Sequence, residues 1–195
     1  MKKIIILFIA IAAPLIQFAQ GSPDESRFTL GTRGGFGHSW ISSGNNSFNG
    51  SWFIGLGTMY QVSEHVGIGA DALYSSEGAS YKVGDATVNT QLDYFRIPLK
   101  VAYYFKPLSE DLRPKIGAGL NVGFLMSDPK HTSAGYQDLD FGGNVFAGLD
   151  YRLLDGFWMT FDANYYNGFT DIYKGNTGSD MNRNIRLDIG LMISF

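Results

Sequence analysis

The chain is organised by an alternation of apolar and polar residues that recurs along most of its length. In the C-terminal stretch RLDIGLMISF, apolar side chains alternate with polar or small ones up to Phe195. Such alternation is typical of a β-strand with two different faces, because successive side chains of a strand point to opposite sides of the sheet. Stretches of this kind, each about ten residues long, occupy residues 28–40, 51–62, 66–74, 92–105, 115–126, 140–151, 157–168 and 184–195.

The connections between these eight predicted strands alternate in length. The short ones cover residues 63–65, 106–113 and 154–156, whereas the Gly/Ser/Asn-rich ones cover residues 42–50, 77–90, 127–137 and 170–182. In an up-and-down meander, this alternation places all the long loops at one end, and both termini join the short-turn end. Outer-membrane barrels show the same asymmetry. The pattern therefore predicts an all-β fold, an eight-stranded antiparallel up-and-down transmembrane β-barrel.

Alternation alone does not say which face is inside, because a soluble, lipocalin-like barrel alternates too. Most strand glycines share the polar face, where a narrow interior would need small residues. The polar face also lacks the Lys/Glu/Thr coat of a solvated sheet. On the apolar face, aromatic residues gather near the strand ends, as in interfacial girdles. These features favour an apolar face that contacts lipid.

The charged residues of the polar face occur in equal numbers of each sign, as buried charges that must be paired would. They are Arg33, Arg96, Lys100, Lys115 and Arg186, against Asp71, Asp140, Asp150, Asp162 and Asp188. We expect them to form a structural ion-pair network that fills the barrel; a proton or ion relay is the alternative. Arg96 and Lys100 lie four residues apart and need separate partners, for which Asp71 and Asp162 are candidates.

Residues 1–20, MKKIIILFIAIAAPLIQFAQ, have the form of a secretory signal peptide: two lysines, an apolar run too short to span a membrane, and a small-residue stretch. A buried N-terminal helix is the alternative. We expect residues 21–195 to form one barrel domain that is exported to the outer membrane, with both termini in the periplasm. The sequence contains no cysteine, so disulfides and lipid attachment at a cysteine are excluded.

The C-terminal segment is similar to the insertion motif of outer-membrane proteins: a polar residue, a glycine, then an apolar position and a terminal aromatic. Asp188, Gly190, Ile193 and Phe195 occupy these places. The expected partners are therefore outer-membrane lipid and, during insertion, the barrel-assembly machinery. The net charge of -3 and the pI near 5.5 argue against a nucleic-acid partner.

The sequence contains little that indicates a catalytic site or a metal site. His38, His65 and His131 fall in different regions and form no metal-ligand pattern. Rim-located lipid-modifying barrels use His, Ser and Asp, but neighbouring His38 and Ser39 must point to opposite faces of their strand, and Asp140 lies on another strand. We expect no enzyme activity, no metal and no cofactor.

The chain resembles the PorT-like outer-membrane β-barrel family. The likeness is carried by LGTRGGFG, LDYFRIPLKVAYYF, RPKIGAGLNVGFLM, YYNGFTDI and RNIRLDIGLMISF, which together extend over the mature chain. It implies a small eight-stranded barrel in the outer membrane. The family's named member is associated with a protein-secretion apparatus, whereas no functional residues carry over.

Three functions remain open from the sequence. The first is a non-catalytic barrel, structural or in contact with an unknown protein partner through its loops or periplasmic turns. The second is a narrow channel or relay through the interior. The third is an enzyme at the outer rim.

Overall fold

The computed structural model describes residues 27–42, 46–83, 86–127, 135–174 and 180–195. The predicted signal peptide, residues 1–20, lies outside these ranges. Within them the strands are β1 (Phe28–Ile41), β2 (Asn46–Ser47), β3 (Gly50–Gln61), β4 (Val66–Val83), β5 (Ala86–Tyr104), β6 (Leu112–Ser127), β7 (Leu139–Leu154), β8 (Phe157–Asp171) and β9 (Met181–Ser194). No helix in the described part of the chain is long and apolar enough to cross a membrane.

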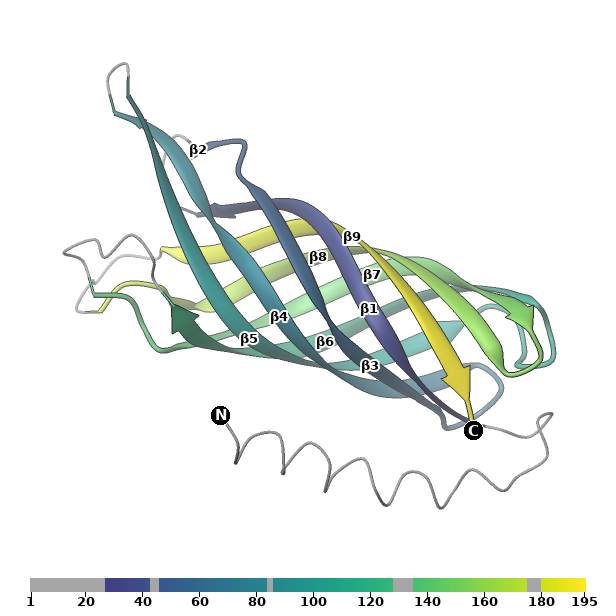
Figure 1. Ribbon diagram of the computed structural model, residues 1–195. Helices are drawn as coiled ribbons and strands as arrows, with labels where there is room; N and C mark the ends of the chain where they lie inside the picture. The colour runs from purple at the N-terminus through teal and green to yellow at the C-terminus, as the bar shows by residue number, and fades with distance from the viewer. Residues whose placement is uncertain (1–26, 43–45, 84–85, 128–134, 175–179) are drawn as a thin grey trace, which may run out of the picture.

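The strands form one closed antiparallel barrel (Figure 1). β1 and β3 to β9 each pair with their neighbours along the chain, and β1 pairs with β9 to close the cylinder. The short β2 adds only a two-residue pairing with β4 at the loop end. The eight-stranded antiparallel barrel predicted from the alternation is therefore confirmed. Closure leaves no long strand with an unpaired edge.

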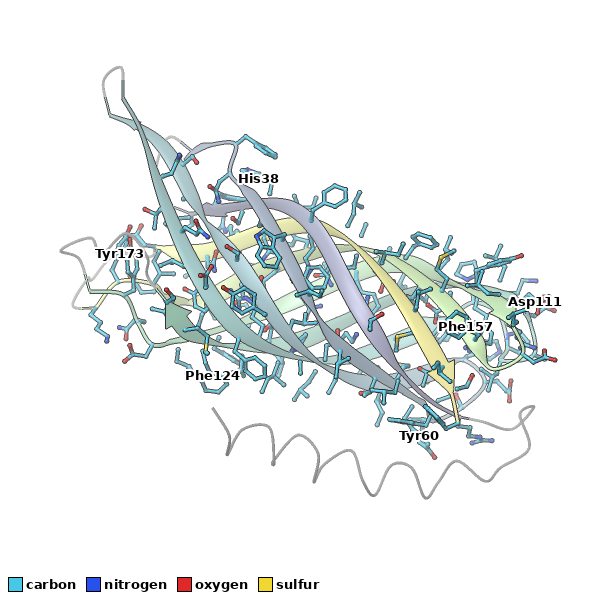
Figure 2. The ribbon with its side chains drawn as sticks, in the orientation of Figure 1. His38, Tyr60, Asp111, Phe124, Phe157 and Tyr173 are labelled. Atoms are coloured by element: carbon cyan, nitrogen blue, oxygen red, sulfur yellow. The ribbon has the colours of Figure 1, made fainter. Side chains whose placement is uncertain are left out.

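Side chains alternate between the interior and the outer surface along every long strand. In β9, for example, inward-facing positions are buried, whereas Ile185, Leu187 and Ile189 are exposed on the outside. Figure 2 shows Tyr60 and Phe124 on the same outer surface, where both side chains are exposed. The exposed apolar residues thus surround the barrel, whereas polar and charged residues, together with two apolar clusters, fill it. This is the arrangement that the glycines and aromatics of the sequence indicated.

Both ends of the described chain lie at the short-turn end. The backbone N–H of Phe195 donates to the carbonyl of Phe28 at 2.8 Å. At the turn between β7 and β8, Gly156 takes a φ of 74°, a conformation that favours glycine. The described parts of the connections between β1 and β3, β6 and β7, and β8 and β9 lie at the opposite end (Figure 1), as expected from their lengths.

One segment expected to be a loop, residues 77–90, is mostly strand. β4 continues to Val83 and β5 begins at Ala86, and their pairing extends from Glu77 opposite Leu92 to Val83 opposite Ala86. This hairpin rises past the other strands at the loop end (Figure 1). Its Gly, Ser and Asn content suggested a loop, but the ladder is formed by backbone N–H and C=O groups, which these residues also carry.

Candidate functional site

All ten charged residues predicted for the polar face project into the barrel. Asp150 is the most accessible of them, with 16% of its side chain exposed, and the others are buried. Each lies at an inward position of its strand, so the positions follow from parity alone. Their pairing, by contrast, depends on the register between strands that lie far apart in the sequence.

Arg33 on β1 is the centre of the network in the middle of the barrel. Its guanidinium donates to Asp162 on β8 and lies 3.7 Å from a carboxylate oxygen of Asp71 on β4. Asp188 on β9 follows at 3.9 Å, and Arg186 donates to that same carboxylate at 3.0 Å. One buried cation therefore links three strands, and Arg186 joins them through Asp188.

The two lysines extend this network around the barrel wall. Lys100 on β5 donates to Asp71 at 2.7 Å. Lys115 on β6 contacts Asp150 at 2.6 Å and Asp162 at 3.1 Å. Of the pairings expected from the sequence, Lys100 with Asp71 is found. Asp162 does not form an ion pair with Arg96; it pairs with Arg33 and Lys115 instead.

Arg96 forms a separate layer closer to the loop end. Its Nε and Nη2 donate to the two oxygens of Glu77 at 2.6 and 2.7 Å, and Nη2 also reaches Asp140 at 2.7 Å. The rings of Tyr94 and Tyr166 each lie 4.6 Å from the guanidinium carbon. Sequence reasoning missed Glu77 as a partner because it fell in a segment interpreted as a loop.

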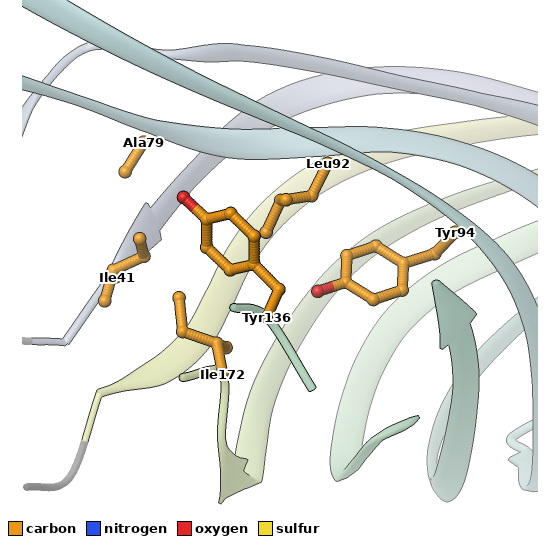
Figure 3. Close-up of a cluster of buried hydrophobic side chains, with 6 residues drawn as sticks. All are labelled: Ile41, Ala79, Leu92, Tyr94, Tyr136 and Ile172. Atoms are coloured by element: carbon orange, nitrogen blue, oxygen red, sulfur yellow. The ribbon is translucent and has the colours of Figure 1, made fainter. Parts of the chain in front are cut away.

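Above the Arg96 layer, a cluster of buried apolar side chains, here called the apolar cap, lies at the loop end of the barrel (Figure 3). The cap consists of Ile41, Ala79, Leu92, Tyr94, Tyr136 and Ile172. Tyr136 and Ile172 come from the two long connections that flank β7 and β8. These connections hold each other, because Gln137 N–H donates to the carbonyl of Ile172 and Lys174 N–H to that of Gly135, both at 2.8 Å.

The short-turn end is different, because it contains a cavity of about 600 Å³. Its wall includes Arg113, Arg152 and Trp158. Toward the middle of the barrel lies a second apolar cluster, formed by Met59, Ala102, Tyr104 and Phe146. Arg113 was expected in a turn, but it lies at an inward position of β6 and is buried.

The residues considered for catalysis at the rim do not come together. His38 faces outward and stacks between Trp40 and Phe48, with ring centroids 5.1 and 4.9 Å away. Ser39 faces inward and accepts a hydrogen bond from the Gly78 N–H at 2.9 Å. Asp140 is held by Arg96, as described above. His131 lies outside the described residues, and within them no group of three or more His, Asp or Glu could hold a metal ion.

Three of the four residues of the predicted insertion motif lie in the second half of β9, and the fourth, Phe195, directly follows the strand. Asp188 faces inward within the ion-pair network, and Gly190 lies opposite Arg33 of β1 and Thr160 of β8. Ile193 is exposed on the apolar outer surface. Phe195 follows the strand and bonds to β1 through its backbone.

The architecture matches a known family. The model of the outer membrane protein beta-barrel domain matches residues 4–193. The chain belongs to this family. It is therefore an outer-membrane protein, and the apolar surface of its barrel faces lipid. No curated protein sequence matches this chain.

Solved structures of other outer-membrane barrels are similar in fold. The outer membrane protein OprG from Pseudomonas aeruginosa has a TM-score of 0.59 and 15% identity, with 90% of this chain and 99% of that chain covered. Neisserial surface protein A has a TM-score of 0.57 and 17% identity, covering 87% and 98%. Outer Membrane Protein W of E. coli has a TM-score of 0.52 and 16% identity, also covering 87% and 98%. At these identities the likeness concerns the fold alone.

Proposed function

We propose that this protein is a non-catalytic outer-membrane barrel with a plugged interior, which acts as a structural element or contacts a protein partner. The observation that carries the proposal is the filling of the interior between the loop end and the cavity at the short-turn end. The apolar cap, the Arg96 layer, the network around Arg33 and the cluster around Tyr104 follow one another. An eight-stranded barrel is just wide enough for side chains to fill it in this way.

Recording from planar bilayers tests the plugged barrel against a narrow channel or relay. We expect the purified protein to produce no conductance steps and no proton current above the bare bilayer. Discrete steps that scale with the amount of inserted protein would reject the plugged barrel and favour a conducting interior. A porin inserted under the same conditions controls for bilayer quality.

The absence of enzyme activity is also part of the proposal. It is supported by the positions of His38 and Ser39, which lie on opposite faces of β1. We expect the mass profile of lipid A to be unchanged when the gene is removed. A shift corresponding to the loss or gain of an acyl or polar group would instead assign a lipid-modifying activity.

If the protein binds a partner, we propose to test first whether it has an accessory role in protein secretion, because the sequence resembles PorT-like barrels. Photo-crosslinking groups placed in the long loops and in the short turns would capture neighbours in intact outer membranes. Capture of a secretion component from one end would support the role. If only lipid is captured from both ends, the partner-binding role is rejected and the structural role is retained.

The orientation belongs to the same proposal: the leader, residues 1–20, is removed on export, and both termini and the short turns lie in the periplasm. Short periplasmic turns and long external loops are the rule for such barrels. A tag inserted in the turn after Leu154 should be reached by antibody only after the outer membrane is permeabilised. Labelling of intact cells at that turn would reverse the orientation.

We also propose that the C-terminal motif is recognised by the barrel-assembly machinery. Phe195→Ala should reduce the amount of folded barrel in the outer membrane, while the same variant folds normally from urea into detergent. Equal loss in both settings would indicate a purely structural role for this residue.

A further inference from the structure

The cavity at the short-turn end is bounded by all three short turns. Glu64 comes from the turn between β3 and β4, Leu108 from that between β5 and β6, and Asp155 from that between β7 and β8. With a volume of about 600 Å³, it is within the range of sites that hold small ligands or peptide segments. The cluster around Tyr104 and the ion-pair network separate it from the loop end.

Arg113 is the residue of this cavity that indicates a ligand-binding site. Only 1% of the residue is exposed, yet no carboxylate of the described residues forms an ion pair with it, unlike the other buried cations. Its Nη2 donates to Gln61 Oε1 at 3.3 Å and to the carbonyl of Glu64 at 3.1 Å, and its Nε donates to the carbonyl of Lys106 at 3.4 Å. These three acceptors are neutral.

The carboxylates that line the cavity are not directed at Arg113. Asp150 accepts from Lys115 at 2.6 Å, and Glu64 accepts from the Leu108 N–H at 3.0 Å. A buried guanidinium that hydrogen-bonds only to neutral acceptors favours an anion, because charge-assisted hydrogen bonds are stronger than neutral ones. The nearby Glu64, Asp150 and Asp155 disfavour a highly charged anion such as a phosphate. The charge distribution therefore selects a single carboxylate.

The rest of the wall is partly apolar. The guanidinium carbon of Arg113 lies 3.9 Å from the ring centroid of Tyr104 and 6.0 Å from that of Trp158, and Arg152 lies over Trp158 at 4.7 Å. Met192 and Leu108 complete the apolar part. A free dicarboxylate would leave these surfaces uncovered, whereas an acidic residue between apolar neighbours would contact them.

We propose that the short-turn mouth of the barrel binds a peptide segment that carries one acidic side chain between apolar residues. The carboxylate accepts hydrogen bonds from the guanidinium of Arg113, and the apolar neighbours pack against Trp158 and Met192. This inference rests on the proposed function, since it specifies which kind of partner segment the short-turn end of the barrel would bind. Its test is separate, because conductance decides whether the barrel is plugged and peptide binding decides whether the mouth is a binding site.

The probe is the peptide acetyl-Gly-Leu-Asp-Leu-Gly-amide, titrated calorimetrically into the full mature protein in lipid nanodiscs. Its matched partner has Asn in place of Asp. We expect the acidic peptide to bind at least about tenfold more tightly than the Asn peptide, as a charge-assisted bond to a buried guanidinium would give. Equal affinities, or binding by neither peptide, would overturn the proposal. Sodium succinate that binds as tightly as the acidic peptide would overturn the assignment to a peptide.

Two variants locate the site. Arg113→Gln should remove the preference for the acidic peptide, whereas Lys106→Gln removes a charge at the same end, from an exposed side chain that does not line the cavity, and should retain it. If Arg113→Gln still prefers the acidic peptide, the carboxylate binds elsewhere and the proposal is wrong. If Arg113→Gln does not fold, the comparison of the two peptides on the native chain still decides the question.

Discussion

At the scale of single residues, the interior is built around space for long charged side chains. A Cβ at Gly57 on β3 would lie 2.5 Å from Cδ of Arg33 and 2.8 Å from a carboxylate oxygen of Asp71. A Cβ at Gly123 on β6 would similarly meet the guanidinium of Arg96 at 2.8 Å. Glycine at these positions allows the ion pairs to form inside a narrow cylinder.

Substituting Gly57 should therefore be costly, although alanine adds only a methyl group. We expect Gly57→Ala to lower the free energy of unfolding by about 1–3 kcal/mol, the usual cost of overpacking. The control is Gly34→Ala on the outer face of β1, where the nearest atom to a Cβ is the Phe53 carbonyl oxygen at 3.5 Å. Urea unfolding in phospholipid vesicles measures both, and equal stabilities would show that Arg33 relaxes without cost.

Asp162 should be more important for stability than any exposed carboxylate, because it serves both Arg33 and Lys115. Asp162→Asn leaves two buried cations with less counter-charge, and we expect a loss on the order of 3 kcal/mol. Asp138→Asn removes a carboxylate that pairs with Lys174 at 2.9 Å on the surface and should cost less than about 1 kcal/mol. Similar losses in the same unfolding assay would contradict the importance of the buried network.

The sequence was sufficient to place most interior charges, but of their pairings it indicated only that of Lys100 with Asp71 correctly. Parity within a strand identifies which residues face inward, so the position of Arg33 could be predicted from its own strand. Its contact with Asp162 depends on strands that are 129 residues apart along the chain. Glu77 and Arg113 were missed because each lies where a strand extends into a segment that has the composition of a loop or turn.

At the scale of elements, the long connections do more than join strands, because two of them contribute side chains to the apolar cap. Tyr136 and Ile172 have no periodic pattern around them, so the sequence did not predict the cap. Their position depends on backbone pairing between two loops and on packing against Leu92 of β5. Such contacts between loops have no counterpart in the local sequence.

The cap should control access to the interior from the loop end. Because the chain has no cysteine, Leu92→Cys provides a single thiol, at a residue that is only 1% exposed. We expect a water-soluble maleimide to react with it slowly, and at least about tenfold faster when Tyr136→Ala is added, since removing the ring opens the cap. Ser63→Cys in an exposed turn should react quickly with or without Tyr136→Ala. An unchanged rate at residue 92 would show that Tyr136 does not seal the mouth.

At the scale of the whole molecule, the outer surface is an apolar belt that matches the membrane. We expect a charge on this belt to be costly in proportion to its depth. Val145 lies near the middle of β7 and is 56% exposed, so Val145→Arg should cost about 2–4 kcal/mol. Leu154, at the end of the same strand and 72% exposed, should tolerate arginine at a cost of about 0–1 kcal/mol. Folding titrations in vesicles measure the difference, and equal costs would contradict a transmembrane orientation of the strands.

The pairing of β1 with β9 has a consequence for biogenesis. Thr29 lies opposite Ser194 and Ile41 opposite Asn182, so β1 finds one of its two partner strands only after the chain as far as residue 194 has been synthesised. Until then its backbone donors and acceptors on that side have no strand to bond. We therefore expect the chain to stay unfolded until residues 181–194 are available to pair with β1.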